Sequence, residues 1–514
     1  MKFWVGNLLL FTLATTAYFG WNKNSTAFIF PAGCDVFGYV QMAQTIHDSR
    51  NNGTYPSFEI KTPQTQALIA ALQGSKFPAS RFSEFVAPHA HHYIEKSGKI
   101  TCQYSPGTGW VLSWFKDYSG PQKLNEIIII FFTLIGLFGG WSILRQGFIF
   151  QAFSWAALCI TQILIAVMMG PRSYSINALL IPMFLAIDTA RRGGFFFSFF
   201  SGVFSGLLVL IRPANLLLLP LPALMVGWKR WGGFSIGAFL GGGLPLLLHQ
   251  YREAGGYLDP TYGVLDTGGT SFVHFWSHIK TYLWDRFDAY WAWVLCLGLI
   301  SVLVTTLLKD FESHRQAKWG WIASAFLVLF GGFLFFGTHG QIVSYYLLPT
   351  YLAFSWAVIY AVAQIPLTVF ASPFINGIWF IIFLVLPFAE IGGLAGHGPP
   401  AFKEPMQNIR PEGRDLESIP PELLDEHAWI WGDDTTGTFW YFAKKNAMKP
   451  AFADDEILTW SVKWIQKQPE SRQFIVMDPS RMDHALEVVK KAGYKLVLRG
   501  QVFGRQYFEF VKKK

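Results

Sequence analysis

Long apolar runs separated by short polar links fill the chain from Met1 to about Phe388. A bilayer core takes about 20 apolar residues per helix, and about 17 suffice. The pattern therefore predicts a polytopic α-helical membrane protein with about 11 transmembrane helices. The runs are Phe3–Phe19, Ile127–Leu144, Phe148–Met169, Tyr174–Ile187, Phe195–Ile211, Ala214–Trp228, Phe234–Leu248, Tyr290–Leu308, Trp319–Phe336, Ile342–Val362 and about Leu367–Phe388.

The basic residues of the short links predict the orientation of this membrane body. Lys2 precedes the first run, which lacks a small-residue cleavage site and is expected to be an uncleaved signal anchor. Lys and Arg stay on the cytoplasmic side, and alternate links carry them, whereas the link near Gln364 carries none. An odd number of spans then places the tail outside. The basic links hold Arg145, then Arg191 and Arg192, then Lys229 and Arg230, then Lys309, Arg315 and Lys318.

Three segments are expected on the outer face: a large first loop, Asn22–Gln122, a second loop, Gln250–Ala289, and the tail. The predicted division is a transmembrane body (1–395), a linker rich in Gly, Pro and Glu (396–421) and a small soluble α/β domain (422–514). In the last of these, strands are predicted near Gln473–Met477 and Tyr494–Leu498, with a helix at Asp483–Ala492 between them.

The composition agrees with a membrane body and a soluble tail. Residues are 52% hydrophobic and 14% charged, and 35 of the 74 charged residues lie between His397 and Lys514. The 49 Phe and 21 Trp exclude a disordered or collagen-like chain. The net charge is +8, but many basic residues of the body sit in links where they act as topology signals, so we expect no nucleic-acid partner.

The four cysteines fall into two pairs. Cys159 and Cys296 lie in apolar runs and are most simply small buried hydrophobic residues. Cys34 and Cys102 share the first outer loop, which would face an oxidising compartment. Either they form a disulfide or they are two unrelated thiols in a folded loop.

Asp35 begins an apolar spacing that predicts an amphipathic helix on the membrane surface. A carboxylate at the start of such a helix can reach a cavity at the membrane boundary. The alternative is a helix cap, because Asp is favoured there for backbone reasons alone. The apolar positions are Val36, Tyr39, Val40, Ala43 and Ile46.

Two short motifs follow the first apolar run, an Asp-x-x-x-Tyr within Cys34–Tyr39 and a Tyr-Ser-Pro-Gly within Tyr104–Gly109. Their order resembles the GT-C superfamily of membrane glycosyltransferases. The closest likeness is to bacterial members related to protein mannosyltransferases and to the aminoarabinose transferase of lipid A, whose second motif is similar to Tyr-Pro-Pro-Gly, with Ser105 here in place of the first Pro. Leu210–Asn215 and His339–Pro349 also look similar, and the resemblance covers about Met1 to Phe388.

The resemblance implies transfer of a sugar from a polyprenyl-phosphate carrier to a lipid, glycan or protein acceptor. It makes Asp35 the catalytic carboxylate, as general base on the acceptor or as its orienter. It also implies a bacterial inner membrane, with the C-terminus periplasmic. Some members carry a second acid in the second outer link, but Gly170–Ser173 has none, which argues against a two-carboxylate mechanism.

Two arginines are candidates for binding the lipid phosphate. Arg212 and Arg172 lie toward the outer ends of apolar runs, where a cation is costly and suggests a function. Snorkelling to the interface is the alternative for both. The residues expected to line the cavity are Tyr39, Tyr104, His339 and Tyr345.

A histidine cluster follows Pro88 and invites a divalent metal as a cofactor. His89, His91 and His92 lack the i, i+4 spacing of helical zinc motifs, so a loop without metal is the favoured interpretation.

Two other functions remain open. A transporter or flippase of lipid-linked sugars would show internal repeats and broken midplane helices. An O-antigen polymerase or ligase would place its essential Arg and His in later loops.

Overall fold

The computed structural model describes residues 2–25, 34–115, 120–146, 149–169, 174–261, 272–280, 315–338, 347–350, 352–354, 356, 419–432, 435–477, 483–503 and 505–512. The chain divides into two compact units. The membrane unit comprises Met1–Ala27, Pro121–Leu246 and Asp266–Lys403, and the loop unit comprises Phe28–Gly120, Leu247–Leu265 and Glu404–Lys514.

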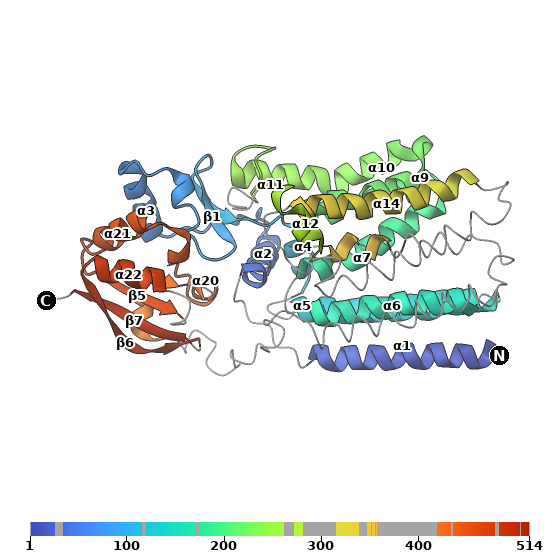
Figure 1. Cartoon of the computed structure of the whole chain (residues 1–514), viewed down its shortest axis with the longest axis horizontal. Helices are drawn as coiled ribbons and strands as arrows, with labels where there is room; N and C mark the ends of the chain where they lie inside the picture. The colour runs from blue at the N-terminus through green and yellow to red at the C-terminus, as the bar shows by residue number, and fades with distance from the viewer. Residues whose placement is uncertain are drawn as a thin grey trace. The chain divides into compact units, whose positions relative to one another are not determined.

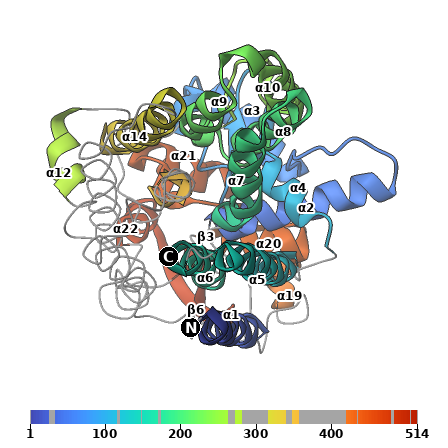
Figure 2. The ribbon, with the colours of Figure 1, turned by 90° about the vertical axis from the view of Figure 1, so that its right-hand side faces the viewer.

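The membrane unit is helical where the structure describes it (Figure 1). α1, α5 and α6 run nearly parallel, and Figure 2 views them almost end on. Each of these helices coincides with an apolar run of the sequence. An apolar run in a bilayer adopts a helix because a helix satisfies its backbone N–H and C=O groups by internal hydrogen bonds. The helices of this unit are α1 (Lys2–Ser25), α5 (Gly120–Arg145), α6 (Ile149–Met169), α7 (Tyr174–Arg192), α8 (Phe195–Ile211), α9 (Pro220–Val226), α10 (Trp231–Ala238), α12 (Phe275–Lys280) and α14 (Arg315–Thr338).

Two helical stretches among the described residues are long and apolar enough to cross a membrane, Pro121–Arg145 and Trp228–Ala254. The second runs through α10, the π-helix Phe239–Gly243 and α11 (Leu244–Ala254). The predicted spans Tyr290–Leu308 and Leu367–Phe388 lie outside the described residues, as does most of Ile342–Val362.

One predicted span is interrupted. The run Ala214–Trp228 is not one continuous α-helix, since the 3-10 helix Pro213–Leu218 precedes α9 and a second 3-10 turn begins at Trp228. Pro213 and Pro220 explain the break, because proline has no backbone N–H and starts helices more readily than it continues them. Hydropathy alone does not detect this interruption.

Glycines let α8 approach the helix formed by α10 and the π-helix. A Cβ at Gly202 or Gly206 would overlap the carbonyl oxygen of Phe234 or Ala238, and one at Gly242 would overlap the carbonyl of Gly206. Small residues at every fourth position allow this backbone-to-backbone packing between membrane helices. Dispersion contacts over this seam therefore depend on the absence of side chains.

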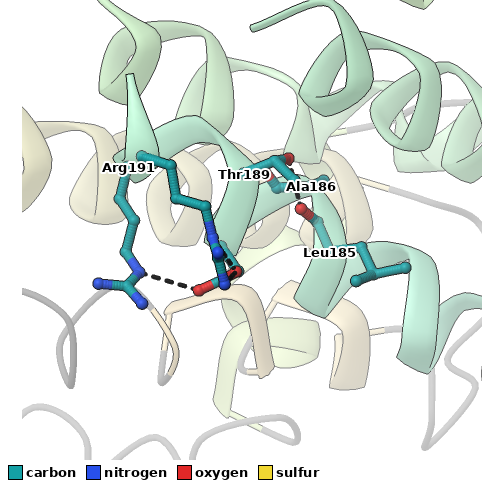
Figure 3. Close-up of polar contacts among 6 residues, drawn as sticks. Leu185, Ala186, Thr189 and Arg191 are labelled. Carbon is teal, nitrogen blue, oxygen red and sulfur yellow. Dashed lines mark hydrogen bonds and ion pairs between the residues drawn. The ribbon is translucent and has the colours of Figure 1, made fainter. Parts of the chain in front are cut away.

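The end of α7 carries the basic residues that the topology prediction placed inside. Arg191 Nε donates to the carboxylate of Asp188 at 2.9 Å, and Arg192 pairs with the other oxygen at 2.6 Å (Figure 3). The hydroxyl of Thr189 donates to the carbonyl of Leu185 in the same turn (Figure 3). Asp188 is 5% exposed, so these arginines neutralise a carboxylate that would otherwise be buried alone.

The loop unit combines parts of all three segments expected on the outer face. Of the second loop it includes the residues up to Leu265, whereas α12 belongs to the membrane unit. Its first segment holds α2 (Cys34–Asn51), α3 (Pro63–Gly74), the hairpin β1 (His91–Ile94) and β2 (Lys99–Cys102), and α4 (Gly107–Leu112). The second segment joins it where Glu253 accepts from the Thr101 hydroxyl at 2.7 Å and the Arg252 guanidinium lies over the Tyr55 ring.

The tail forms a five-stranded mixed sheet in the order β4-β3-β5-β7-β6, with β3, β4 and β5 parallel and the other pairs antiparallel. Ile430, Phe439, Phe474 and Tyr507 belong to its buried core. The strands expected near Gln473–Met477 and Tyr494–Leu498 are β5 and β6. The elements are α19 (Pro421–Leu424), β3 (Ala428–Gly432), α20 (Thr436–Ala443), β4 (Ala447–Met448), α21 (Asp455–Ile465), β5 (Arg472–Met477), α22 (Asp483–Lys491), β6 (Tyr494–Val502) and β7 (Arg505–Lys512).

The tail is not a separate unit, because it packs against the first loop segment. The Lys449 N–H donates to the Phe85 carbonyl at 2.9 Å, and the Asn446 amide donates to Val86 at 2.7 Å. Arg81 forms ion pairs with Asp454 and Glu456, both at 2.7 Å. Residues about 370 positions apart thus build one folded unit.

Candidate functional site

Helix α2 carries the candidate carboxylate, Asp35, and this helix is enclosed by other elements of the loop unit. A Cβ at Gly109 of α4 would lie 2.7 Å from the Cβ of Met42, so α4 approaches α2 closely. Gly437 of α20 lies directly against the ring of Phe37. α2 thus packs against α4 through Met42 and against α20 through Phe37. The apolar positions that predicted a helix on the membrane surface are buried within the loop unit, namely Val36, Tyr39, Val40, Ala43 and Ile46.

Asp35, Gly38 and Tyr39 form one face of α2, since they are spaced i, i+3 and i+4. The Tyr104 hydroxyl donates to Asp35 Oδ1 at 2.5 Å, and the rings of Tyr39 and Tyr104 stack with centroids 4.6 Å apart. A Cβ at Gly38 would lie 2.7 Å from the Tyr104 ring and 2.6 Å from Ala90. The structure therefore brings together three predicted site residues, with glycine supplying the space.

The segment after β2 fixes Tyr104 from the other side. The Gln103 N–H donates to the Ala90 carbonyl at 2.8 Å, and the Thr261 hydroxyl donates to the Gln103 carbonyl at 3.3 Å. The ring of His249 hydrogen-bonds to the Tyr104 backbone. Pro106 then precedes α4, where its fixed φ suits a helix start.

Asp35 lies in the first turn of α2, and its carboxylate accepts a side-chain hydrogen bond from a residue 69 positions away. A first-turn carboxylate also interacts favourably with the helix dipole. The carboxylate is half-buried and held in one orientation, which is the geometry that a general base requires.

The predicted disulfide stays a prediction. Cys102 is fully buried at the end of β2, where it is paired in register with His91. Cys34 begins α2, but its side chain lies outside the described residues.

The histidine cluster is built into the packing of the loop unit. The His89 N–H donates to the Thr436 hydroxyl at 3.1 Å, and His91 Nδ1 donates to the His89 carbonyl at 2.9 Å. Burial lowers the pKa of His91 to about 3 and that of His92 to about 4, so both rings are neutral at pH 7. Neighbouring strand residues point to opposite faces, so His91 and His92 cannot share one ion. Among the described residues, no group of three His, Cys, Asp or Glu side chains could hold a metal.

Sequence reasoning missed an ion pair between a buried lysine and a half-buried glutamate beside these histidines. Lys449 is 4% exposed, and its Nζ lies 3.8 Å from Glu84 Oε2. Burial raises the pKa of Glu84, while the charges of Lys449 and His89 act in the opposite direction. A lone lysine in a polar tail gives no signal in the sequence that it becomes buried.

Arg212 ends α8 in the membrane unit. Its N–H donates to the Leu208 carbonyl at 3.1 Å, its own carbonyl accepts from the Asn215 N–H at 2.8 Å, and its side chain is half-buried. Arg172, His339 and Tyr345 lie outside the described residues.

Comparison with known proteins found similar solved structures. No protein-family model and no curated protein matches the chain. ArnT from Cupriavidus metallidurans bound to undecaprenyl phosphate aligns with 97% of each chain at 11% identity and a TM-score of 0.48. The same protein in the apo state aligns with equal coverage and identity at a TM-score of 0.45. The structural neighbours are thus an aminoarabinose transferase of the GT-C superfamily. Because these structures are only 11% identical to this chain, the chemical argument depends on the residues described above.

Proposed function

We propose that the protein is a glycosyltransferase of the GT-C type, which moves a sugar from a polyprenyl-phosphate carrier to an acceptor at the outer face of a bacterial inner membrane. The observation that carries the proposal is the Asp35 carboxylate, oriented by the Tyr104 hydroxyl beside the stacked ring of Tyr39. Motifs 69 residues apart, which resemble those of the superfamily, meet at this carboxylate. The donor is of the same lipid class as the undecaprenyl phosphate to which ArnT is bound.

The chemistry requires a base and a site for the leaving phosphate. Asp35 takes the proton of the acceptor hydroxyl or amine as that group forms a bond to the anomeric carbon of the sugar. The bond from this carbon to the phosphate oxygen breaks through an oxocarbenium-like state, and the lipid phosphate departs with its negative charge. Arg212 and Arg172 are the proposed cations for that charge, since guanidinium binds phosphate through paired hydrogen bonds. No metal-dependent step is proposed, because the described histidines do not fit a metal site.

The test is Asp35→Asn in the purified, full-length protein. Asparagine has the same size, and its amide oxygen can still accept from Tyr104, so folding should be retained while the base is lost. The expected rate of lipid-phosphate release from polyprenyl-phosphate hexoses and pentoses is about a hundred- to ten-thousand-fold lower. The mutant should still bind the donor, because a carboxylate repels the phosphate rather than binding it.

Asp259→Asn is the matched control. Asp259 is a carboxylate of the same unit, paired with Lys96 and 42% exposed, so its removal should leave transfer unchanged. Transfer at the normal rate by folded Asp35→Asn protein would return the weight to the transporter interpretation.

A further inference from the structure

A second face of α2 carries a cavity that the transfer chemistry does not use. The cavity measures about 180 Å³ and is lined by Val40, Ala43, Gln44, His47, Asp48, Asn51, Phe115 and Tyr441. At 100° per residue, this face lies about 150° around the helix from the face of Asp35 and Tyr39. The cavity is therefore a separate site within the loop unit.

The shape and lining of the cavity suit one sugar ring. Pockets for drug-sized ligands measure about 300–1,000 Å³, so this cavity holds something smaller. Planar polar side chains at i, i+3, i+4 and i+7 follow one helix face, namely Gln44, His47, Asp48 and Asn51. Two aromatic rings, Tyr441 and Phe115, complete the wall. Hydroxyl groups can bond to the polar row while the C–H face of a sugar packs on an aromatic ring.

Two of the polar groups present acceptor atoms. The side-chain oxygen of Gln44 is buried and has no hydrogen-bond partner among the described residues. Buried polar atoms of this kind normally have a partner, from the protein or from a ligand or water. His47 Nδ1 lies 3.1 Å from the Ser113 carbonyl, which can only accept, so in the neutral ring Nε2 is the acceptor. Both atoms can accept hydrogen bonds from hydroxyl groups.

The charges around the cavity favour a neutral ligand. Asp48 is the carboxylate in the lining, and Lys444 at the end of α20 interacts with its charge. Lys444 Nζ also lies 5.8 Å from the centre of the Tyr441 ring. A second cation, Arg50 of α2, donates a hydrogen bond to the Ser113 hydroxyl at 2.8 Å, and its guanidinium lies over the Trp114 ring. A phosphate would meet the carboxylate of Asp48, and the nearby positive charge of Lys444 already interacts with that carboxylate.

We propose that this cavity binds a neutral monosaccharide unit of a glycan, at a site distinct from Asp35. Saturation-transfer NMR on the full-length protein in nanodiscs tests it with the methyl glycosides of D-glucose, D-mannose and D-galactose. At least one glycoside should receive saturation, and D-glucose 1-phosphate, the anionic probe, should bind more weakly than methyl glucoside.

Two variants and two controls locate the binding. Gln44→Leu keeps the volume and removes the acceptor, and Asn51→Ala truncates an exposed position that should not affect folding. Each should weaken the glycoside about 2- to 12-fold, the loss expected for one neutral hydrogen bond. Asn52→Ala changes the neighbouring exposed asparagine, which does not line the cavity, and should bind as the wild type does.

Asp35→Asn should also bind the glycoside normally, which separates this site from the proposed transfer. The proposal is overturned if no methyl glycoside binds, if both cavity variants bind like the wild type, or if the sugar phosphate binds more tightly than the neutral glycoside.

Discussion

Removing the Tyr104 hydroxyl is the sharpest test of how the candidate base is held. In Tyr104→Phe the ring remains, so its stacking on Tyr39 at 4.6 Å and its contact with Gly38 are retained. The lost contact is the 2.5 Å hydrogen bond to Asp35. The variant therefore changes the orientation of the carboxylate with little change in packing.

The expected magnitude follows from the charge of the acceptor. A hydrogen bond to a charged group contributes about 1.5–3 kcal/mol net. At 1.36 kcal/mol for each tenfold in rate, complete loss in the transition state lowers transfer by about 10- to 150-fold. Asp35 is only half-buried, so water replaces part of the bond and the lower end is expected. The loss should be smaller than that of Asp35→Asn, because the base itself is still present.

Tyr93→Phe is the matched control in a transfer assay with the purified protein. Its hydroxyl accepts from Gln73 at 3.1 Å elsewhere in the loop unit, and its ring stacks on Phe82. Both variants lose a hydrogen-bonded phenol, but only Tyr104→Phe should lose rate. Equal rates for the two variants would refute the orienting role of Tyr104.

Three further outcomes test the packing. Gly38→Ala should lower transfer at least as much as Tyr104→Phe, because its Cβ displaces the ring; a fully active Gly38→Ala would contradict the close fit. Gly206→Leu should prevent α8 from packing on Ala238, seen as a lower thermal midpoint in detergent, whereas an unchanged midpoint would exclude this seam. Burial lowers the pKa of His92 to about 4. Lowering the pH from 6.5 toward 4 should therefore reduce the free energy of unfolding of the loop unit by about 1.4 kcal/mol per pH unit for each such histidine. The unfolded chain then binds a proton that the folded chain excludes, and His92→Gln should flatten the pH dependence of chemical unfolding.

Local patterns predicted the elements that depend on local spacing. The segment Gln473–Met477, predicted as a strand, forms most of β5, and the apolar runs found α5 and α8. Within the predicted span Ala214–Trp228 a 3-10 segment precedes α9, and hydropathy could not show this because it ignores the N–H that proline lacks. Motif order brought Asp35 and Tyr104 to attention, and these two side chains are hydrogen-bonded.

Packing between distant segments could not be predicted in the same way. The cavity on α2 needs Tyr441, about 390 residues from His47, and no spacing within α2 indicates which ring will face it. Lys449 likewise becomes buried, and Glu84 half-buried, only because α20 and β4 pack on the first loop. The spacing of apolar residues shows which face of a helix or strand is buried, because it repeats every 3.6 or 2 residues. It does not show which distant helix or strand packs against that face.

The position of Asp35 depends on contacts made on different sides of one helix. Phe37 and Gly38 are about 100° apart around α2. Phe37 packs on Gly437 of the tail, and Gly38 packs on Tyr104 of the first loop. Two contacts at different angles prevent the helix from rotating, which a single contact would permit. The tail therefore belongs to the structure that orients the carboxylate, although it supplies none of the predicted site residues.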